Sequence, residues 1–136
     1  MKLTKTCAGL PASSHPFYIC HCITHDYALD TKVARRIDEL YNMREKLKHF
    51  YGDSLEYGEA YLVDNVFNLV AKIDFMDIEG AYDVLEEALY DMRYQMRESM
   101  ITKLIIPKLG YEAPVELIIA DVFEDMDVEI VLCVEV

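Results

Sequence analysis

The stretch HCITHDYALDTKVARRID, residues 21–38, carries the chain from an apolar run into an amphipathic segment. The apolar run, residues 15–23, is rich in aromatic and branched side chains, which is typical of a central strand covered on both faces. From residue 30 to about residue 51 apolar side chains recur at helical spacing, so we predict one helix of about six turns that Gly52 closes. The connection between the strand and the helix contains no glycine.

The rest of the sequence alternates strand and helix patterns. Two β-rich runs, residues 60–63 and 66–72, flank Asp64-Asn65 and predict a hairpin. We therefore predict an α/β fold, a single-domain three-layer α/β/α sandwich that spans residues 1–136. The other expected elements are helices over residues 80–99 and 114–126 and strands over 101–107 and 127–136, and a strand can also form over residues 2–6.

The charge balance limits the partners of this chain. Its 136 residues include 25 acidic and 13 basic side chains, which gives a formal net charge of −12. Nucleic-acid binding that ignores sequence needs a basic patch for the phosphates, so this composition argues against it. A diphosphate would also approach against the field of the whole chain, but a few local donors can outweigh surface charge that is screened beyond roughly 10 Å.

The spacing of cysteines and histidines does not match a metal site. No CxxC pair occurs, and Cys20 and Cys22 alternate on the apolar run so that both face one side, which is typical of small buried side chains in a reducing, cytoplasmic protein. We expect no metal, no cofactor and, because no apolar run approaches the 18 or so residues of a membrane span, no membrane partner. The four histidines are His15, His21, His25 and His49.

Two predicted corners are the natural places for a ligand. In open α/β sheets ligands bind outside the carboxyl ends of the strands, where loop donors and helix N-termini converge. Residues 24–32 and residues 107–114 form such corners in the predicted order of elements. At the first corner, His25 beside Asp26 can act as a general base or can simply cap the turn.

Several segments, taken in order, resemble a known family. In joint order and spacing they are similar to a macro domain, in particular to the branch that includes the terminal ADP-ribose protein glycohydrolase. The resemblance runs from about residue 8 to the C-terminus, and it implies a macro-domain-like mixed sheet that holds ADP-ribose across the two corners. The segments are HCITHD (21–26), YLVDNVFNLVAK (61–72), AYDVLEEAL (81–89), IIPKLG (105–110) and DVFEDMDVEIVLCV (121–134).

Lys72 is the residue that the resemblance connects with catalysis. It falls where the glycohydrolase branch has a lysine that attacks the ribose carbon. A lysine nucleophile needs a pKa lowered towards neutrality, whereas Asp74 and Asp77, close in sequence, favour the charged form. A solvated lysine at the end of an edge strand is the other interpretation.

Both phosphate loops of the family are altered in this sequence. The first phosphate loop corresponds to YALDTKVA at residues 27–34 and has no glycine. The second loop is shorter than in the family but keeps Gly110. In addition, Gly9 stands where the branch has the carboxylate that binds adenine. Tyr27 and Tyr111 occupy the two corner loops, where their rings can stack on a base or can fill the cleft.

Asp30 stands at the expected start of the first helix. Its carboxylate is suited to cap this helix by accepting from the N–H of Lys32 or Val33, an arrangement worth about 1 kcal/mol. The same carboxylate would occupy or repel the anion that the family places at this position. Lys32 would offset one negative charge at most.

Two functions from different classes remain open. The first is a macro-domain-like protein that binds ADP-ribose, a related nucleotide or an ADP-ribosylated protein, with removal of ADP-ribose through Lys72 if it is an enzyme. The second is an interaction or structural module of the same fold that has lost the nucleotide.

The residues that could bind the ligand come from both corners. The family pattern HCIS.D is matched at His21, Cys22, Ile23, Thr24 and Asp26. The candidate ligand-binding residues are His21, Thr24, Asp26, Tyr27, Asp30, Lys32, Gly110 and Tyr111.

Overall fold

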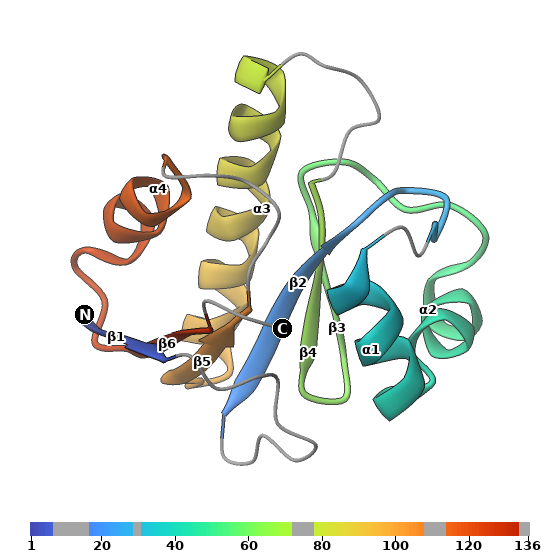
Figure 1. The fold of residues 1–136 in the computed structure, drawn as a ribbon, viewed down its shortest axis with the longest axis horizontal. Helices are drawn as coiled ribbons and strands as arrows, with labels where there is room; N and C mark the ends of the chain where they lie inside the picture. The colour runs from blue at the N-terminus through green and yellow to red at the C-terminus, as the bar shows by residue number, and fades with distance from the viewer. Residues whose placement is uncertain (7–16, 29–30, 72–77, 108–113, 134–136) are drawn as a thin grey trace.

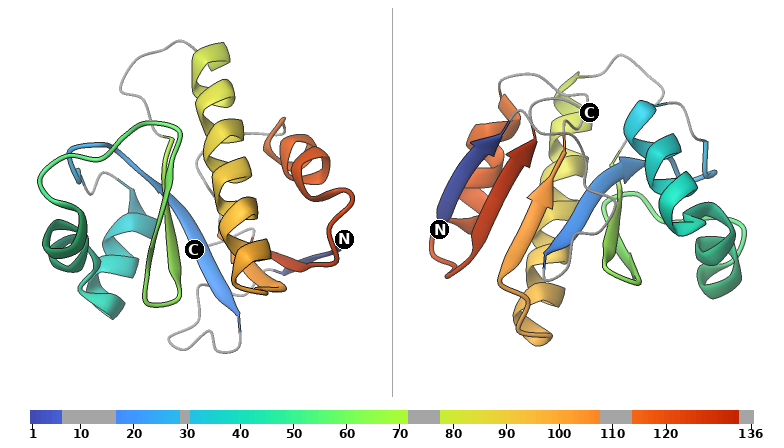
Figure 2. Two further views of the ribbon diagram at one scale, coloured as in Figure 1. Left: turned by 180° about the vertical axis from the view of Figure 1, so that it is seen from behind. Right: turned by 60° about the horizontal axis from the view of Figure 1, so that its bottom comes forward.

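A six-stranded sheet with helices on both faces forms the centre of the molecule (Figures 1 and 2). The computed structural model describes residues 1–6, 17–28, 31–71, 78–107 and 114–133. The strand order is β1-β6-β5-β2-β4-β3, and all neighbouring strands are parallel except β3 and β4. The predicted α/β sandwich with a mixed sheet is therefore confirmed. The strands are β1 (Lys2–Thr6), β2 (Tyr18–Ile23), β3 (Ala60–Val63), β4 (Val66–Val70), β5 (Lys103–Ile106) and β6 (Glu129–Cys133), and the helices are α1 (Lys32–Tyr41), α2 (Met43–Tyr51), α3 (Ile78–Glu98) and α4 (Pro114–Phe123).

The predicted central strand, β2, lies between β5 and β4 and is buried on both faces. Ile19 and Ile23 pack on the side of α1 and α2. Cys20 and Cys22 pack on the side of α3 and α4, which confirms that both cysteines are buried on one face. Each fully buried isoleucine contributes about 1.5–3 kcal/mol relative to an exposed one, so the apolar run holds β2 at the centre of the sheet.

The prediction of one continuous helix over residues 30–51 is wrong. Asn42 adopts the left-handed conformation, with φ 52° and ψ 46°, and separates α1 from α2. The carboxylate of Asp38 accepts a hydrogen bond at 2.8 Å from the backbone N–H of Arg44, so the end of α1 also caps the start of α2. The predicted closure at Gly52 is confirmed, because α2 ends at Tyr51 and the N–H of Gly52 donates to the carbonyl of Lys48.

The predicted cap of the first helix is also wrong. The N-cap residue of α1 is Thr31, and its Oγ1 accepts a hydrogen bond at 3.0 Å from the N–H of Ala34. A threonine at this position satisfies one of the N–H groups that the first turn leaves without a helical partner. Asp30 lies outside the described residues, so its proposed effect on an anion stays a prediction.

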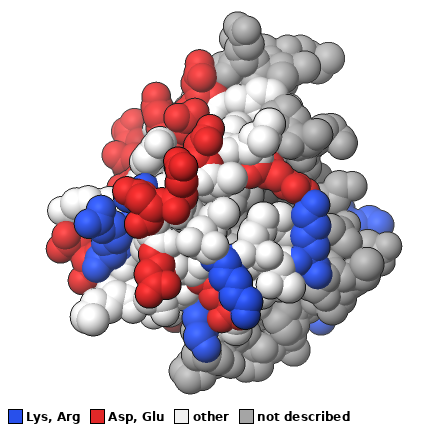
Figure 3. Space-filling model, turned by 90° about the vertical axis from the view of Figure 1, so that its left-hand side faces the viewer, with Lys and Arg blue, Asp and Glu red and all other residues white. Residues whose placement is uncertain are grey.

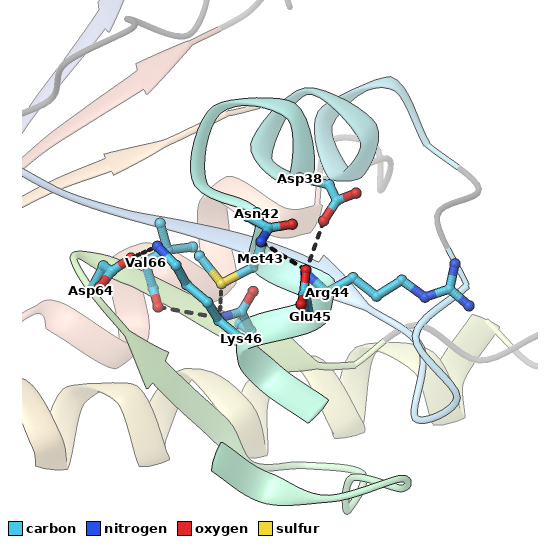
Figure 4. A network of polar contacts seen from close by, with 9 residues as sticks. Asp38, Asn42, Met43, Arg44, Glu45, Lys46, Asp64 and Val66 are labelled. Atoms are coloured by element: carbon cyan, nitrogen blue, oxygen red, sulfur yellow. Dashed lines mark hydrogen bonds and ion pairs between the residues drawn. The ribbon is translucent and has the colours of Figure 1, made fainter. Parts of the chain in front are cut away.

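The predicted hairpin is confirmed as β3 and β4, joined by Asp64 and Asn65. Asp64 has a positive φ of 55°, which suits a two-residue turn between antiparallel strands. Its carboxylate lies 2.6 Å from Nζ of Lys46, so an ion pair ties the turn to α2 (Figure 4). β4 ends at Val70, two residues short of the predicted end, and Lys72 lies outside the described residues.

The free edge of the sheet at β3 is covered by side chains from two helices. A carboxylate oxygen of Asp91 accepts from the N–H of Ala60 at 2.7 Å, and Nε2 of Gln95 donates to the carbonyl of the same residue at 2.7 Å. The hydroxyl of Tyr51 donates to the carbonyl of Leu62 at 3.0 Å. Backbone groups on an edge strand are otherwise open to pairing with another chain, so these contacts protect the edge.

The remaining predicted elements are confirmed with shifts of a few residues at their ends. They are α3, β5, α4, β6 and the N-terminal strand β1, which pairs with β6. No helix in the part of the chain that the structure describes is long and apolar enough to cross a membrane.

Candidate functional site

Thr24 fixes the turn that follows β2. Its hydroxyl donates to the carboxylate of Asp26 at 2.6 Å and accepts from the N–H of Ala28 at 3.0 Å, while its carbonyl accepts from the N–H of Tyr27 at 3.2 Å. Asp26 is exposed, and the hydrogen bond from Thr24 lowers the pKa of its carboxyl group. The structure therefore brings the predicted residues Thr24 and Asp26 together in a single hydrogen-bonded turn.

Tyr27 lies under this turn with its side chain only 2% exposed. Its backbone has a positive φ of 64°, its hydroxyl donates to the carbonyl of Gly52, and burial raises the pKa of its phenol. Nζ of Lys48 lies 5.6 Å from the centre of the ring. This placement agrees with the interpretation in which the ring fills space at the corner.

His21 is buried on β2, on the side of α1 and α2, with 2% of its surface exposed. Its Nε2 lies 2.5 Å from Oδ1 of Asn68 on β4. The amide nitrogen of Asn68 donates to the carbonyls of Tyr61 and Val66, so the amide oxygen faces the imidazole and Nε2 must carry the proton. Burial lowers the pKa of His21 to about 4, which keeps the ring neutral at pH 7.

The other ring nitrogen of His21 is in a different situation. Nδ1 is buried and has no hydrogen-bond partner among the described residues. His21, Met43 and Arg44 contribute to the lining of a small cavity of about 10 Å³, close to the space that one water molecule needs. Figure 4 shows the side chain of Arg44 extended away from Met43 and Lys46. His21 thus has the contacts of a core histidine, which is one of the interpretations that its sequence position allows.

His25 connects the corner to the segment before β3. Its Nδ1 lies 2.8 Å from the hydroxyl of Tyr57, and the two rings are 5.0 Å apart with a tilt of 45°. Its carbonyl accepts from the N–H of Leu55 at 3.1 Å. These contacts place a half-exposed imidazole beside Asp26 and show how it holds the turn.

The first turn of α1 completes the corner, and its charges are unusual. It contains no acidic residue, while the side chains of Lys32 and Arg35 are both exposed. The N-terminus of a helix carries a partial positive charge and prefers acidic side chains. This end of α1 therefore has two cations beside helix N–H groups, an arrangement that suits an anion. Lys32 was predicted as a site residue and Arg35 was not.

The ends of the central parallel strands lie together at this edge of the sheet. Val70, the last residue of β4, pairs with Ile23, the last residue of β2. Within the described residues no group of three His, Cys, Asp or Glu side chains could hold a metal ion. Four predicted site residues lie outside the described part of the chain: Asp30, Lys72, Gly110 and Tyr111.

A larger hollow of about 400 Å³ lies at the other end of the molecule, where α3 ends and β5 begins. Met96 and Ile101 contribute apolar surface, and Arg93, Arg97 and Asp125 contribute charge. Arg93 is already bound to Asp125 at 2.8 Å. None of the predicted site residues is among the residues that line this hollow.

Comparison with solved structures agrees with the arrangement of sheet, helices and corner. The chain is similar to the macrodomain of Thermus aquaticus DarG (TM-score 0.77, 17% identity, 96% of this chain and 97% of that one). It is also similar to the macrodomain of Mycobacterium tuberculosis DarG (TM-score 0.74, 16% identity, 96% of each chain). A variant of the Oceanobacillus iheyensis macrodomain with ADPR has a TM-score of 0.62 and 12% identity, over 89% of this chain and 80% of that chain.

Comparisons at the level of sequence give no further relatives, since neither a protein-family description nor a curated protein matches. At 17% identity or less, the similarity to solved structures concerns the fold. It extends over nearly the whole length of both chains in the two DarG cases. The chain therefore has the macrodomain fold.

Proposed function

We propose that the protein binds ADP-ribose or a related nucleotide diphosphate at the corner between β2 and α1. The observation that carries this proposal is the first turn of α1, where the side chain of Lys32 is exposed beside the N–H groups of the helix and no residue is acidic. Helix N–H groups and an exposed cation together suit a phosphate. The similarity to a macrodomain structure that contains ADPR supports the choice of ligand.

The cations in the first turn oppose the stability of α1. A charge of the wrong sign at a helix terminus costs typically 0.3–1 kcal/mol. Departures from local preferences of this kind concentrate at functional sites, where a ligand provides the compensating interaction. A bound diphosphate would add negative charge at this turn, and it would compete there with the carboxylate of Asp30, whose effect on an anion is predicted from the sequence.

Binding is best tested by thermal melting with and without ADP-ribose. A ligand at 100 times its dissociation constant stabilises the folded protein by about 2.7 kcal/mol, which is a readily measured shift. Lys32→Glu should reduce the shift, whereas the matched reversal Arg97→Glu, in the last turn of α3, should leave it unchanged. No shift at millimolar ADP-ribose in low salt would reject nucleotide binding and favour an interaction or structural module.

A hydrolytic function is the second candidate, and it depends on the first. It assigns Lys72 the role of attacking the ribose carbon with its neutral amine. The bond from this carbon to the modified protein side chain breaks, the side chain leaves, and water then hydrolyses the lysine adduct and releases ADP-ribose. The pairing of Val70 with Ile23 supports this role, because β4 ends at the same edge of the sheet as the corner and Lys72 comes two residues later in the sequence. Lys72→Ala should abolish release of ADP-ribose from a modified peptide while binding of free ADP-ribose persists. Unchanged turnover would remove Lys72 from the mechanism.

A further inference from the structure

Charge is distributed unevenly over the two helical layers. Residues 32–51, which form α1 and α2, contain six basic and three acidic side chains, a formal +3 in a chain of net −12. Figure 3 views the molecule from the side of α4 and shows a broad group of acidic side chains there. Figure 1 places α1 and α2 at the other side of the molecule. The basic side chains are Lys32, Arg35, Arg36, Arg44, Lys46 and Lys48.

Some of these basic side chains already have acidic partners. Arg36 lies 3.3 Å from Glu39, and Lys46 lies 2.6 Å from Asp64. By contrast, the side chains of Arg44 and Lys48 are exposed, and neither forms an ion pair with another residue of the described ranges. Two exposed cations on α2 are therefore available to a partner.

One aromatic side chain lies beside these two cations. Arg44, Lys48 and Tyr51 follow one another at intervals of four and three residues and therefore share one face of α2, which we call the α2 stripe. Tyr51 is 42% exposed. Arginine and aromatic side chains of this kind are enriched in protein interfaces and in their hot spots.

We propose that the α2 stripe docks an acidic segment of a partner polypeptide. Carboxylates of the segment pair with Arg44 and Lys48, and an apolar side chain beside them packs on Tyr51. This function goes beyond nucleotide binding, because it uses exposed side chains of α2 and not the first turn of α1, although Lys48 also contacts Tyr27 at the corner.

The charge of the whole chain selects among the acidic partners. A nucleic acid is a long polyanion that would extend past the stripe into the field of a chain of net −12. A second copy of this chain would bring the same net charge and the same repulsion. A short acidic peptide segment needs to contact only the local basic surface, since charges beyond roughly 10 Å are screened.

The experiment uses a fluorescein-labelled peptide of glutamate residues interspersed with leucine, and measures its anisotropy with the full chain at low salt. We expect binding that weakens as salt increases and that falls by roughly tenfold or more in the double variant Arg44→Glu/Lys48→Glu. A control double variant, Lys2→Glu/Arg97→Glu, changes the net charge equally at exposed positions on other elements and should bind almost as well as the wild type.

Circular dichroism establishes that each variant is folded before its affinity is compared. Absence of peptide binding at low salt would overturn the proposal, as would an equal loss of affinity in the test and control variants. Tighter binding of a labelled single-stranded oligonucleotide than of the peptide, or concentration-dependent self-association through the stripe, would assign the surface to a different partner and would also overturn it. The peptide titration is repeated in excess ADP-ribose. Binding of the peptide that persists there shows that it does not depend on the nucleotide site, so the two proposals are tested separately.

Discussion

The buried histidine makes the stability of this protein depend on pH in a defined direction. His21 is neutral in the folded state, because burial lowers its pKa from an ordinary value of 6.5 to about 4. In the unfolded chain the imidazole binds a proton near its ordinary pKa. The unfolded state therefore holds more protons than the folded state between these two values, so stability falls as pH decreases through this window.

The magnitude follows from the two pKa values. Full protonation of the unfolded but not of the folded imidazole corresponds to about 3 kcal/mol, since each pKa unit is worth about 1.4 kcal/mol. At about pH 5 the linkage relation gives a loss of about 2 kcal/mol relative to about pH 8. The loss arises because a charged imidazole would need to enter an apolar site beside Asn68, where Nδ1 has no hydrogen-bond partner among the described residues.

The assay compares the wild type with His21→Gln by urea denaturation at about pH 8 and about pH 5. Glutamine can still donate to Oδ1 of Asn68 but does not titrate, so the many carboxylates of the chain contribute equally to both proteins. We expect the wild type to lose about 2 kcal/mol more than the variant over this interval. Direct titration of the His21 ring by NMR should give a midpoint near the same low pKa.

An equal pH dependence of the two proteins would refute this reasoning. So would a greater loss of stability in His21→Gln than in the wild type on acidification. Either result would mean that the imidazole is not held neutral by its surroundings in the folded state.

Three further predictions concern the elements that shape the site and the sheet edge. Thr31→Ala should lower the free energy of unfolding by about 1 kcal/mol in urea melts, and an unchanged value would exclude its role as a cap. Asn42→Ala should lower the free energy of unfolding by about 1–2 kcal/mol, because alanine disfavours the left-handed conformation. Asn42→Gly should lower it clearly less, and an equal loss in the two variants would contradict this explanation. Asp91→Ala should speed hydrogen exchange at the amide of Ala60, whereas the control Glu98→Ala should not, and a slow amide in both variants would show that another group protects it.

The strands of the sheet were predicted well, because short apolar runs and the turn residues between them can be recognised within a few residues of sequence. Asp64-Asn65 between two β-rich runs was sufficient to predict the hairpin, and the apolar run ending at Ile23 was sufficient to place β2 at the centre. The carboxyl ends of parallel strands meet at one edge, so the corner after β2 followed from the order of elements.

The helix break was missed because the apolar spacing continues across it. Asn42 has the polarity expected of a helix surface, and its left-handed backbone leaves no mark in the pattern of apolar residues. Its identity was the available signal, since asparagine adopts positive φ more readily than most residues. The cap was misplaced by one position, because Asp30 and Thr31 are both good capping residues and stand side by side.

The contacts of the site depended on distant parts of the chain. Asn68 is 47 residues from His21, and the parallel register that joins them is not visible in either segment alone. Lys48 on α2 lies over the ring of Tyr27, a contact between segments that α1 separates in the sequence. The cations of the first turn could have been recognised from the sequence, because residues 32–35 contain Lys32 and Arg35 and no acidic residue.

The most direct test of the proposed nucleotide site is a comparison of affinity and stability in Lys32→Glu. Calorimetric titration with ADP-ribose should give an affinity about tenfold lower than that of the wild type, a loss of about 1.4 kcal/mol. Urea denaturation without ligand should give an equal or higher free energy of unfolding, by about 0.3–1 kcal/mol, because glutamate suits the first turn of a helix. An ADP-ribose affinity unchanged by this substitution, or no binding by either protein at millimolar concentration, would contradict the account.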